Sequence, residues 1–358
     1  MVQDDSWFES NDGTKLYMRR WLPEPPFTAD RPDSQAKTVP WAKAAARTKS
    51  ASQTKTGLWP LAVVHIVHGM AEHAGRYGRL AEKLCGAGIA VWAADQRGHG
   101  KTADLSVNGP DKGGILGHCA DKDAFERVTA DIEGINREIR KTHPGIPLFL
   151  LGHSWGSFIV QNYIEDEGGR EAIDGCILSG TRGPAPFKIK AGEKFIALLA
   201  FIIGQRNSSP LARAVADGPY NRPFRPNRTS FDWLSRDEAE VDAFVNDPLD
   251  GNLCSVGFYR DLARGLAHIH QNETMARIRQ DLPIYIFCGS ADPVGEMGAS
   301  PIALVNIYSS LGIKDLEFVL YPGARHETLN ETNRDEVMNN LLSWIHRCTG
   351  SGQATERG

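Results

Sequence analysis

The sequence predicts a doubly wound α/β fold built on a mostly parallel sheet. From Leu61 onward, short runs that are apolar throughout, such as LAVVHIVHG, IAVWAAD and PLFLLGHS, alternate with longer amphipathic segments. Strands of a parallel sheet are covered by helices on both faces and have this continuous apolar pattern. The runs GCILSGT, PIYIFCGSAD and LEFVLYPG repeat it later in the chain. Ligand sites in such sheets lie beyond the carboxyl ends of the strands, so the residues directly after each run are the candidates.

The N-terminal elements are predicted to extend this sheet. The runs SWFES and TKLYMRRWLP are joined by Asn11-Asp12-Gly13, a typical hairpin turn, so we expect an antiparallel hairpin at one edge. Residues 28–57 follow and carry six basic and two acidic residues but almost no large apolar ones. Such a segment cannot bury enough surface to order itself, so we expect a flexible basic insertion without a catalytic part.

The alternation of strands and helices fails between residues 182 and 262. This segment contains prolines, aromatic residues and arginines, and it follows the strand that ends near Thr181. Because it leaves the sheet at the carboxyl side of that strand, it is predicted to form a helical cap over the site. The expected organisation is an α/β core of residues 1–27, 58–181 and 263–348, the insertion 28–57, the cap 182–262 and a disordered tail 349–358.

The composition narrows the class of function. The 358 residues carry 40 basic and 44 acidic side chains, so no strong net field attracts nucleic acid or anionic lipid. The six cysteines lie far apart without a C-x-x-C pair, which indicates reduced thiols rather than disulfides or zinc ligands. No signal-peptide pattern is present, and the longest apolar run, Phe195 to Ile203, is too short to cross a bilayer. We expect a cytoplasmic protein that uses no metal or other cofactor and binds no nucleic acid.

The pentapeptide GHSWG places one hydroxyl, that of Ser154, between a predicted strand and a predicted helix. Serine alone could simply cap the helix, but a cap requires neither Gly152 nor Gly156. Glycine two residues before and two after the serine is typical of the nucleophile elbow, a turn so tight that larger side chains would collide with the backbone. We therefore predict that Ser154 is a nucleophile.

A serine hydroxyl needs a base to take its proton and an acid group to orient that base. His326 lies in YPGARHETLN, between the last predicted strand and the last helix, and Asp292 lies just beyond the PIYIFCG strand. Both are at strand ends on the side of Ser154. The chain order Ser154, Asp292, His326 is also the order of the serine–acid–histidine triad in doubly wound hydrolases.

Attack on a carbonyl builds negative charge on its oxygen, and backbone N–H groups aimed at that oxygen stabilise it. One donor is expected to be the N–H of Trp155, which follows the nucleophile at the start of the helix. The other is expected from HGMAEHAGRY, the loop after LAVVHIVHG, where we choose the N–H of Met70. Glu72, His73 and Arg76 in the same loop are expected to shape it rather than to react.

These motifs resemble a known family. VHGMAEHAGRY, DQRGHGKT, LLGHSWGS, NDPLDG, GSADPVG and PGARHETLNE, in this order, are similar to the monoacylglycerol lipase and lysophospholipase group of α/β-hydrolases, which shares its catalytic domain with serine aminopeptidase-like hydrolases. The resemblance covers nearly all of residues 7–26 and 61–346. It implies an α/β-hydrolase fold, the triad and oxyanion amides given above, and a cap that admits one acyl chain and touches membranes.

Two features depart from this pattern or refine it. Family elbows more often have methionine and glycine where this chain has Trp155 and Ser157, so the indole is expected to narrow or redirect the acyl pocket. The apolar stretch EKFIALLAFIIG in the cap is expected to guide the acyl chain or to form a buried cap core. The substrate-binding candidates in it are Phe195, Leu198, Leu199 and Ile202.

The resulting hypothesis is a serine carboxylic ester hydrolase acting on single-chain lipid esters, either monoacylglycerols or lysophospholipids. A peptidase or acyltransferase with the same chemistry is the first alternative, and a non-catalytic binding protein of the same fold is the second. Aminopeptidase activity requires carboxylates for a free amino terminus. The acidic residues of the cap that could supply them, or could simply face solvent, are Asp232, Asp237, Glu238, Glu240 and Asp242.

Overall fold

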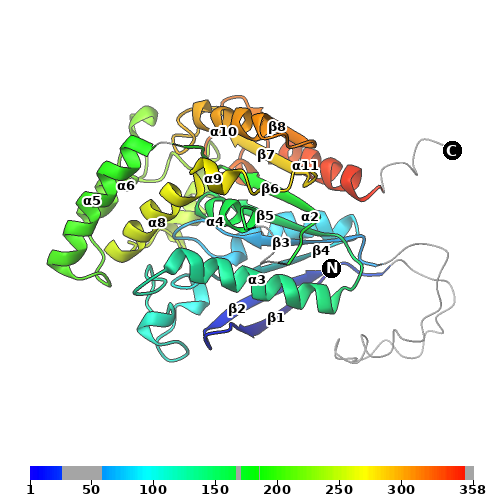
Figure 1. Ribbon diagram of the computed structural model, residues 1–358, viewed down its shortest axis with the longest axis horizontal. Coiled ribbons are helices and arrows are strands. Elements are labelled where there is room, and N and C mark those ends of the chain that lie inside the picture. The colour runs from blue at the N-terminus through cyan, green and yellow to red at the C-terminus, as the bar shows by residue number, and fades with distance from the viewer. Residues whose placement is uncertain (26–58, 167–170, 185, 351–358) are drawn as a thin grey trace.

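In the part of the chain that the structure describes, an eight-stranded sheet forms the centre of the protein, with the strand order β1-β2-β4-β3-β5-β6-β7-β8 (Figure 1). The computed structural model describes residues 1–25, 59–166, 171–184 and 186–350. The strands are β1 (Val2–Glu9), β2 (Lys15–Leu22), β3 (Ala62–Val67), β4 (Ile89–Ala94), β5 (Leu148–His153), β6 (Gly175–Ser179), β7 (Ile284–Gly289) and β8 (Leu316–Tyr321). β2 pairs antiparallel with β1 and β4, and the other neighbours are parallel. The predicted N-terminal hairpin and mostly parallel sheet are confirmed.

Alternate residues of each central strand enter two separate cores. In β3, Val63 and Val67 pack on one face of the sheet, while Val64 and Ile66 pack on the other. Both faces are therefore dry, which is why the sequence of this strand is apolar throughout. The first face is covered by α3 (Ala124–Thr142), α4 (Trp155–Ile164) and α10 (Ala299–Ser310), and the second by α2 (Gly78–Gly86) and α11 (Arg334–Thr349).

The segment between β6 and β7 is helical. It contains α5 (Pro186–Ile203), α6 (Pro210–Ala216), α7 (Glu238–Asn246), α8 (Val256–Ile269) and the short α9 (Asn272–Met275). Serine and aspartate side chains begin three of these helices, since Ser209, Asp237 and Ser255 accept hydrogen bonds from backbone N–H groups of the first turns. Figure 1 shows α5 and α6 at one end of the molecule, with α8 between them and the sheet.

The boundary predicted for the cap at residue 262 falls inside α8. This helix packs against α5 of the cap and also against α3 and α4 of the core, so it belongs to both layers. The predicted basic insertion at 28–57 lies outside the described residues. Residues 351–358 of the predicted tail also lie outside them. None of the helices in the described ranges is both long enough and apolar enough to cross a bilayer.

Candidate active site

Ser154 is the single residue between β5 and α4, and its backbone has an unusual conformation. Its φ of 51° and ψ of −122° lie in a region that residues other than glycine rarely occupy, at a typical cost of about 1–3 kcal/mol. Hydrogen bonds hold the turn on both sides. The Ser154 N–H donates to Ser179 O at 2.9 Å, and the Ser157 hydroxyl donates to Ser154 O at 2.6 Å. The side chain of Ser154 is thus presented at the carboxyl end of the sheet.

The two elbow glycines are required by close packing of backbone atoms. A Cβ atom on Gly152 would lie 2.5 Å from Gly156 O. A Cβ atom on Gly156 would lie 2.2 Å from Val67 O and 2.5 Å from His68 O, at the end of β3. Real Cβ atoms essentially never come within 3.0 Å of such atoms. The close approach expected at both glycines is therefore present.

Asp292 and His326 meet beyond the ends of β7 and β8. Nδ1 of His326 lies 2.9 Å from Oδ2 of Asp292, and both side chains are buried. The other carboxylate oxygen accepts a hydrogen bond from the Val294 N–H at 2.8 Å. A carboxylate can only accept, so the proton is on Nδ1 and Nε2 has a free lone pair. Burial alone would lower the pKa of His326, but the charge and hydrogen bond of Asp292, together with the charges of Glu327 and Glu72, outweigh it, and the pKa of His326 is raised.

Ser154 and His326 line the same cavity, whose empty volume is about 480 Å³ including its open mouth. No hydrogen bond joins the Ser154 hydroxyl to the His326 ring among the described residues. Contacts between a nucleophile and its base are often long in free enzymes and shorten when substrate binds. The arrangement can therefore perform nucleophilic attack with His326 Nε2 as base.

The predicted oxyanion amides flank this serine. Met70 follows β3 and lines the cavity. The adjoining Gly69 is so close that a Cβ atom on it would lie 3.2 Å from Ser154 Cβ. Neither the Met70 N–H nor the Trp155 N–H donates a hydrogen bond to any residue that the structure describes. Because Trp155 also begins α4, its N–H lies at the positive end of the helix dipole.

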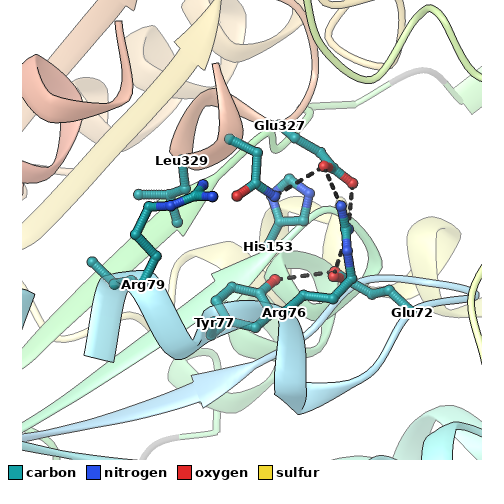
Figure 2. A pocket seen from close by; sticks show the side chains of 9 residues that line it. Glu72, Arg76, Tyr77, Arg79, His153, Glu327 and Leu329 are labelled. Carbon is teal, nitrogen blue, oxygen red and sulfur yellow. Dashed lines mark hydrogen bonds and ion pairs between the residues drawn. The ribbon is translucent and has the colours of Figure 1, made fainter. Parts of the chain in front are cut away.

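An arginine connects this loop to the loop of His326. Figure 2 shows Arg76 between Glu72 and Glu327. Its guanidinium donates to both oxygens of Glu327 at 2.6 and 2.7 Å and to Glu72 at 3.1 Å. Its Nε lies 3.3 Å from Asp250 of the cap. Arg76 and Glu72 therefore shape the site, as expected, whereas the part played by Glu327 and Asp250 was not predicted, because they are distant in sequence.

One group of side chains has donor atoms close enough together to hold a metal ion among the described residues, namely His73, Asp247 and Asp250. These groups already have other contacts. His73 Nδ1 accepts from the Gly75 N–H, and His73 Nε2 lies 3.1 Å from Asp247. Burial raises the pKa of Asp250 to about 9, while the neighbouring Arg76 guanidinium acts in the opposite direction. The chemistry of the group fits ion pairing between loop and cap better than metal binding.

The cap residues that line the cavity differ from those predicted. The aromatic and aliphatic walls come from Phe231, Trp233, Leu234, Phe244 and Tyr259, together with a polar pair, Arg213 and Asp217. The predicted residues are not among them. The side chains of Phe195, Leu198 and Ile202 are 39%, 58% and 66% exposed on α5, and Leu199 packs partly buried against the core. A helix that is apolar on most of its surface does not reveal by sequence which face meets the cavity.

The indole of Trp155 packs in the core beside the elbow. It is buried, stacks on His99 with ring centroids 5.2 Å apart and packs against Phe258 at 5.1 Å. It is not among the residues that line the cavity of Ser154. α8 thus provides an apolar space for the indole within the protein core, and its expected effect on the acyl pocket, to narrow or redirect it, stays a prediction.

Comparison with known proteins places this geometry in a family. The chain matches the family described as "Serine aminopeptidase, S33" over residues 59–333. It belongs to this family of α/β-hydrolases. It is 28% identical to a monoacylglycerol lipase of Mycolicibacterium smegmatis, over 80% of this chain and 88% of that protein. It is 41% identical to a monoglyceride lipase homolog of Monkeypox virus, over 80% of this chain and 90% of that protein.

Solved structures agree with the fold. A thermostable carboxyl esterase from Bacillus coagulans superposes with a TM-score of 0.79 at 25% identity, covering 98% of this chain and 99% of that chain. A soluble variant of the monoglyceride lipase of Saccharomyces cerevisiae, in complex with a substrate analogue, superposes with a TM-score of 0.68 at 22% identity, covering 97% and 96%. The family match and the lipase relatives, together with this fold, show that the chain is a hydrolase of the lipase and esterase type.

The raised pKa of His326 predicts the pH dependence of activity. A base must be neutral to accept the Ser154 proton, so kcat/KM should rise with pH through a pKa above 6.5, the usual value for histidine. In Asp292→Asn the carboxylate that raises this pKa is gone, so the acid limb should move to lower pH while the maximal rate falls steeply. The profile of kcat/KM for a soluble ester between pH 5 and 9 measures both effects. An acid limb that stays in place in Asp292→Asn would contradict the assignment.

Proposed function

We propose that the protein is a serine carboxylic ester hydrolase that cleaves single-chain lipid esters, monoacylglycerols first among them, through an acyl-enzyme on Ser154. The observation that carries this proposal is the shared cavity. It contains a serine on a strained elbow and a histidine whose Nδ1 is held by a buried aspartate. The names of the relatives, monoacylglycerol and monoglyceride lipases, supply the substrate class.

The mechanism follows from the positions of these groups. His326 Nε2 takes the proton of Ser154 as the hydroxyl attacks the ester carbonyl, and the Met70 and Trp155 amides bind the developing oxyanion. The imidazolium, stabilised by Asp292, then protonates the leaving alcohol. Water activated by His326 attacks the acyl-enzyme in the same way and releases the fatty acid. The apolar side chains of Phe231, Trp233 and Phe244 would contact the acyl chain.

The five cap acids considered in the sequence analysis do not supply a site for a peptide amino terminus. Asp217, a cap acid that does line the cavity, already forms an ion pair with Arg213 at 3.6 Å. A peptide amino terminus would need unpaired carboxylates in the cavity, but the cap acids considered above have other partners. Asp237 pairs with Arg334 at 2.8 Å, Glu240 with Arg79 at 2.7 Å and Asp242 with Arg228 at 2.5 Å. Neither these three nor Asp232 and Glu238 line the cavity.

A substrate panel tests this proposal. Monoacylglycerol, lysophosphatidylcholine, a short-chain ester and an aminoacyl amide would be compared with the wild-type protein. We expect kcat/KM for monoacylglycerol to exceed that for the aminoacyl amide by at least about 100-fold, a difference of about 2.7 kcal/mol in transition-state binding. Equal or faster cleavage of the amide would favour the peptidase alternative. Faster transfer of the acyl group to an added alcohol than to water would favour the acyltransferase alternative.

The outer surface of the cap supports contact with a membrane. Phe201 is 88% exposed, Ile202 66% and Leu198 58%, all on α5. On the neighbouring α6, Leu211 and Val215 are 54% and 45% exposed. Contiguous exposed apolar side chains are typical of interfaces with membranes or other proteins. For a lipid ester hydrolase we infer that this surface lies on the bilayer, where the substrate resides.

Phe201→Asp should weaken binding to phosphatidylcholine vesicles by about tenfold or more, because inserting one aromatic side chain contributes about 1.5–3 kcal/mol. Vesicle co-sedimentation measures the binding. Leu105→Asp is the matched control, because this residue is 64% exposed but lies outside the cap. Equal vesicle binding by both variants and the wild type would mean that this surface of the cap does not contact the membrane.

A further inference from the structure

The cavity wall opposite the catalytic loops contains a polar group of side chains that the mechanism above does not use. Arg213 and Asp217 lie at the C-terminal end of α6, and Tyr259 lies on α8. All three line the cavity together with Ser154 and His326. The rest of the cap wall is largely aromatic and aliphatic but includes Asn252, and the loops of the core add Glu72 and Glu327 to the lining.

The hydrogen-bonding capacity of these groups is mostly unused. Nε of Arg213 lies 3.6 Å from Oδ2 of Asp217, an ion pair too long for a hydrogen bond. Oδ1 of Asp217 is buried and accepts no hydrogen bond from the residues that the structure describes. The Tyr259 hydroxyl likewise has no partner among those residues, although the side chain is only 4% exposed. Arg213 donates one long hydrogen bond, from Nη1 to Gly251 O at 3.5 Å, and its guanidinium lies over the Phe231 ring, 4.9 Å from the centroid.

Stability alone does not explain this arrangement. A carboxylate at the C-terminal end of a helix is disfavoured by the helix dipole. A buried carboxylate oxygen that accepts no hydrogen bond also loses the solvation that water would give it. Burial raises the pKa of Asp217 to about 6, although Arg213 acts in the opposite direction. An external hydrogen-bond donor in the cavity would relieve this cost.

We propose that Asp217, Arg213 and Tyr259 form the subsite that binds the hydroxyl groups of an uncharged polyol head group while the ester lies at Ser154. This rests on the proposed function. The chemistry of the pair selects the head group. A hydroxyl both donates and accepts, so it can donate to Asp217 and accept from Arg213 at once.

A charged head group fits this subsite less well. A phosphate only accepts hydrogen bonds and would be repelled by Asp217, whereas an ammonium group only donates and would be repelled by Arg213. Because the charges of Arg213 and Asp217 cancel, the pair has no net attraction for either a cationic or an anionic head group. The subsite therefore separates glycerol esters from phosphate-bearing and amine-bearing lipids with the same acyl chain.

The test compares kcat/KM for three esters of one fatty acid below their micelle concentrations: the monoacylglycerol, the methyl ester and the 1-acylglycerol 3-phosphate. The wild type should prefer the monoacylglycerol to both. Asp217→Ala should lower the ratio of monoacylglycerol to methyl ester by about 10- to 100-fold, since methyl esters have no hydroxyl to bind. Asp217→Asn leaves Arg213 unpaired, and should raise the ratio of phosphate ester to monoacylglycerol by about tenfold.

The control variant is Glu238→Ala, which removes a cap carboxylate that is 77% exposed at the surface and does not line the cavity. It should leave both ratios unchanged. Ratios that stay within about twofold of the wild type in both Asp217 variants would overturn the subsite and leave the proposed function standing. Equal kcat/KM values of the wild type for the phosphate ester and the monoacylglycerol would also overturn the subsite. This comparison needs no variant, so it holds even if Asp217→Ala does not fold. A folded wild type that cleaves no ester at all would overturn the proposed function as well.

Discussion

Ser154→Ala should abolish nearly all ester hydrolysis, with a fall in kcat on the order of 10³- to 10⁶-fold. The stability of the variant should change by no more than about 1 kcal/mol, because the Ser154 hydroxyl donates no hydrogen bond to the described residues and its removal leaves none unsatisfied. The loss of activity would then be chemical rather than structural. Hydrolysis of a p-nitrophenyl ester measures the rate, and thermal unfolding measures the stability.

Ser157→Ala is the matched control for this prediction. Ser157 lies one helical turn after the elbow. Its buried hydroxyl donates to Ser154 O and lies 2.8 Å from Thr181 Oγ1, from which it can accept a hydrogen bond. Its removal should lower stability by about 1–2 kcal/mol but reduce activity far less than Ser154→Ala does. The opposite ranking of activities would mean that Ser154 is not the nucleophile.

Gly156→Ala should strongly destabilise the protein. The new Cβ would have to occupy a position 2.2 Å from Val67 O and 2.5 Å from His68 O. These are backbone atoms at the end of β3, so they cannot rotate away, and either α4 or β3 must move. Overpacking of this kind costs about 3 kcal/mol or more, against a total stability of about 5–15 kcal/mol. Because the loop of Met70 begins at His68, activity should fall together with stability.

The control for Gly156→Ala is Gly78→Ala in α2. Gly78 has helical φ and ψ angles of −54° and −42°, and a Cβ atom there would meet no atom within 4 Å. Alanine should therefore be neutral or stabilising by up to about 1 kcal/mol. Chemical unfolding of both variants gives the difference directly. Similar unfolding midpoints for Gly156→Ala and the wild type would show that the elbow is looser than described.

The features that could be predicted from the sequence are those encoded locally. The central strands are buried on both faces, and this makes their sequences apolar throughout. The elbow is recognisable because the close approach at Gly152 and Gly156 fixes glycine two residues on either side of Ser154. Asp292 and His326 could be chosen because parallel strands bring their carboxyl ends to one edge of the sheet. Their contact at 2.9 Å agrees with that choice, while their catalytic roles stay predictions.

The cavity wall could not be predicted, because it depends on how irregular cap segments pack. Phe231 and Trp233 lie in a region without regular periodicity, and their approach to His326 results from tertiary contacts such as the Trp233–His326 ring pair at 5.1 Å. The α5 stretch is apolar on most sides, so its sequence could not separate residues that enter the cavity from Phe201, which points to solvent. Glu327 was missed for the same reason, since its partner Arg76 is 251 positions away.

The central claim is that Ser154 is activated by His326 and Asp292 in one cavity. Fluorophosphonate labelling followed by mass spectrometry of the digested protein tests it most directly, because the reagent reacts with activated serines and not with ordinary ones. We expect a single adduct on Ser154, which is absent in Ser154→Ala and strongly slowed in His326→Ala. A folded protein that does not react, or that reacts at another serine while Ser154 stays free, would contradict the claim.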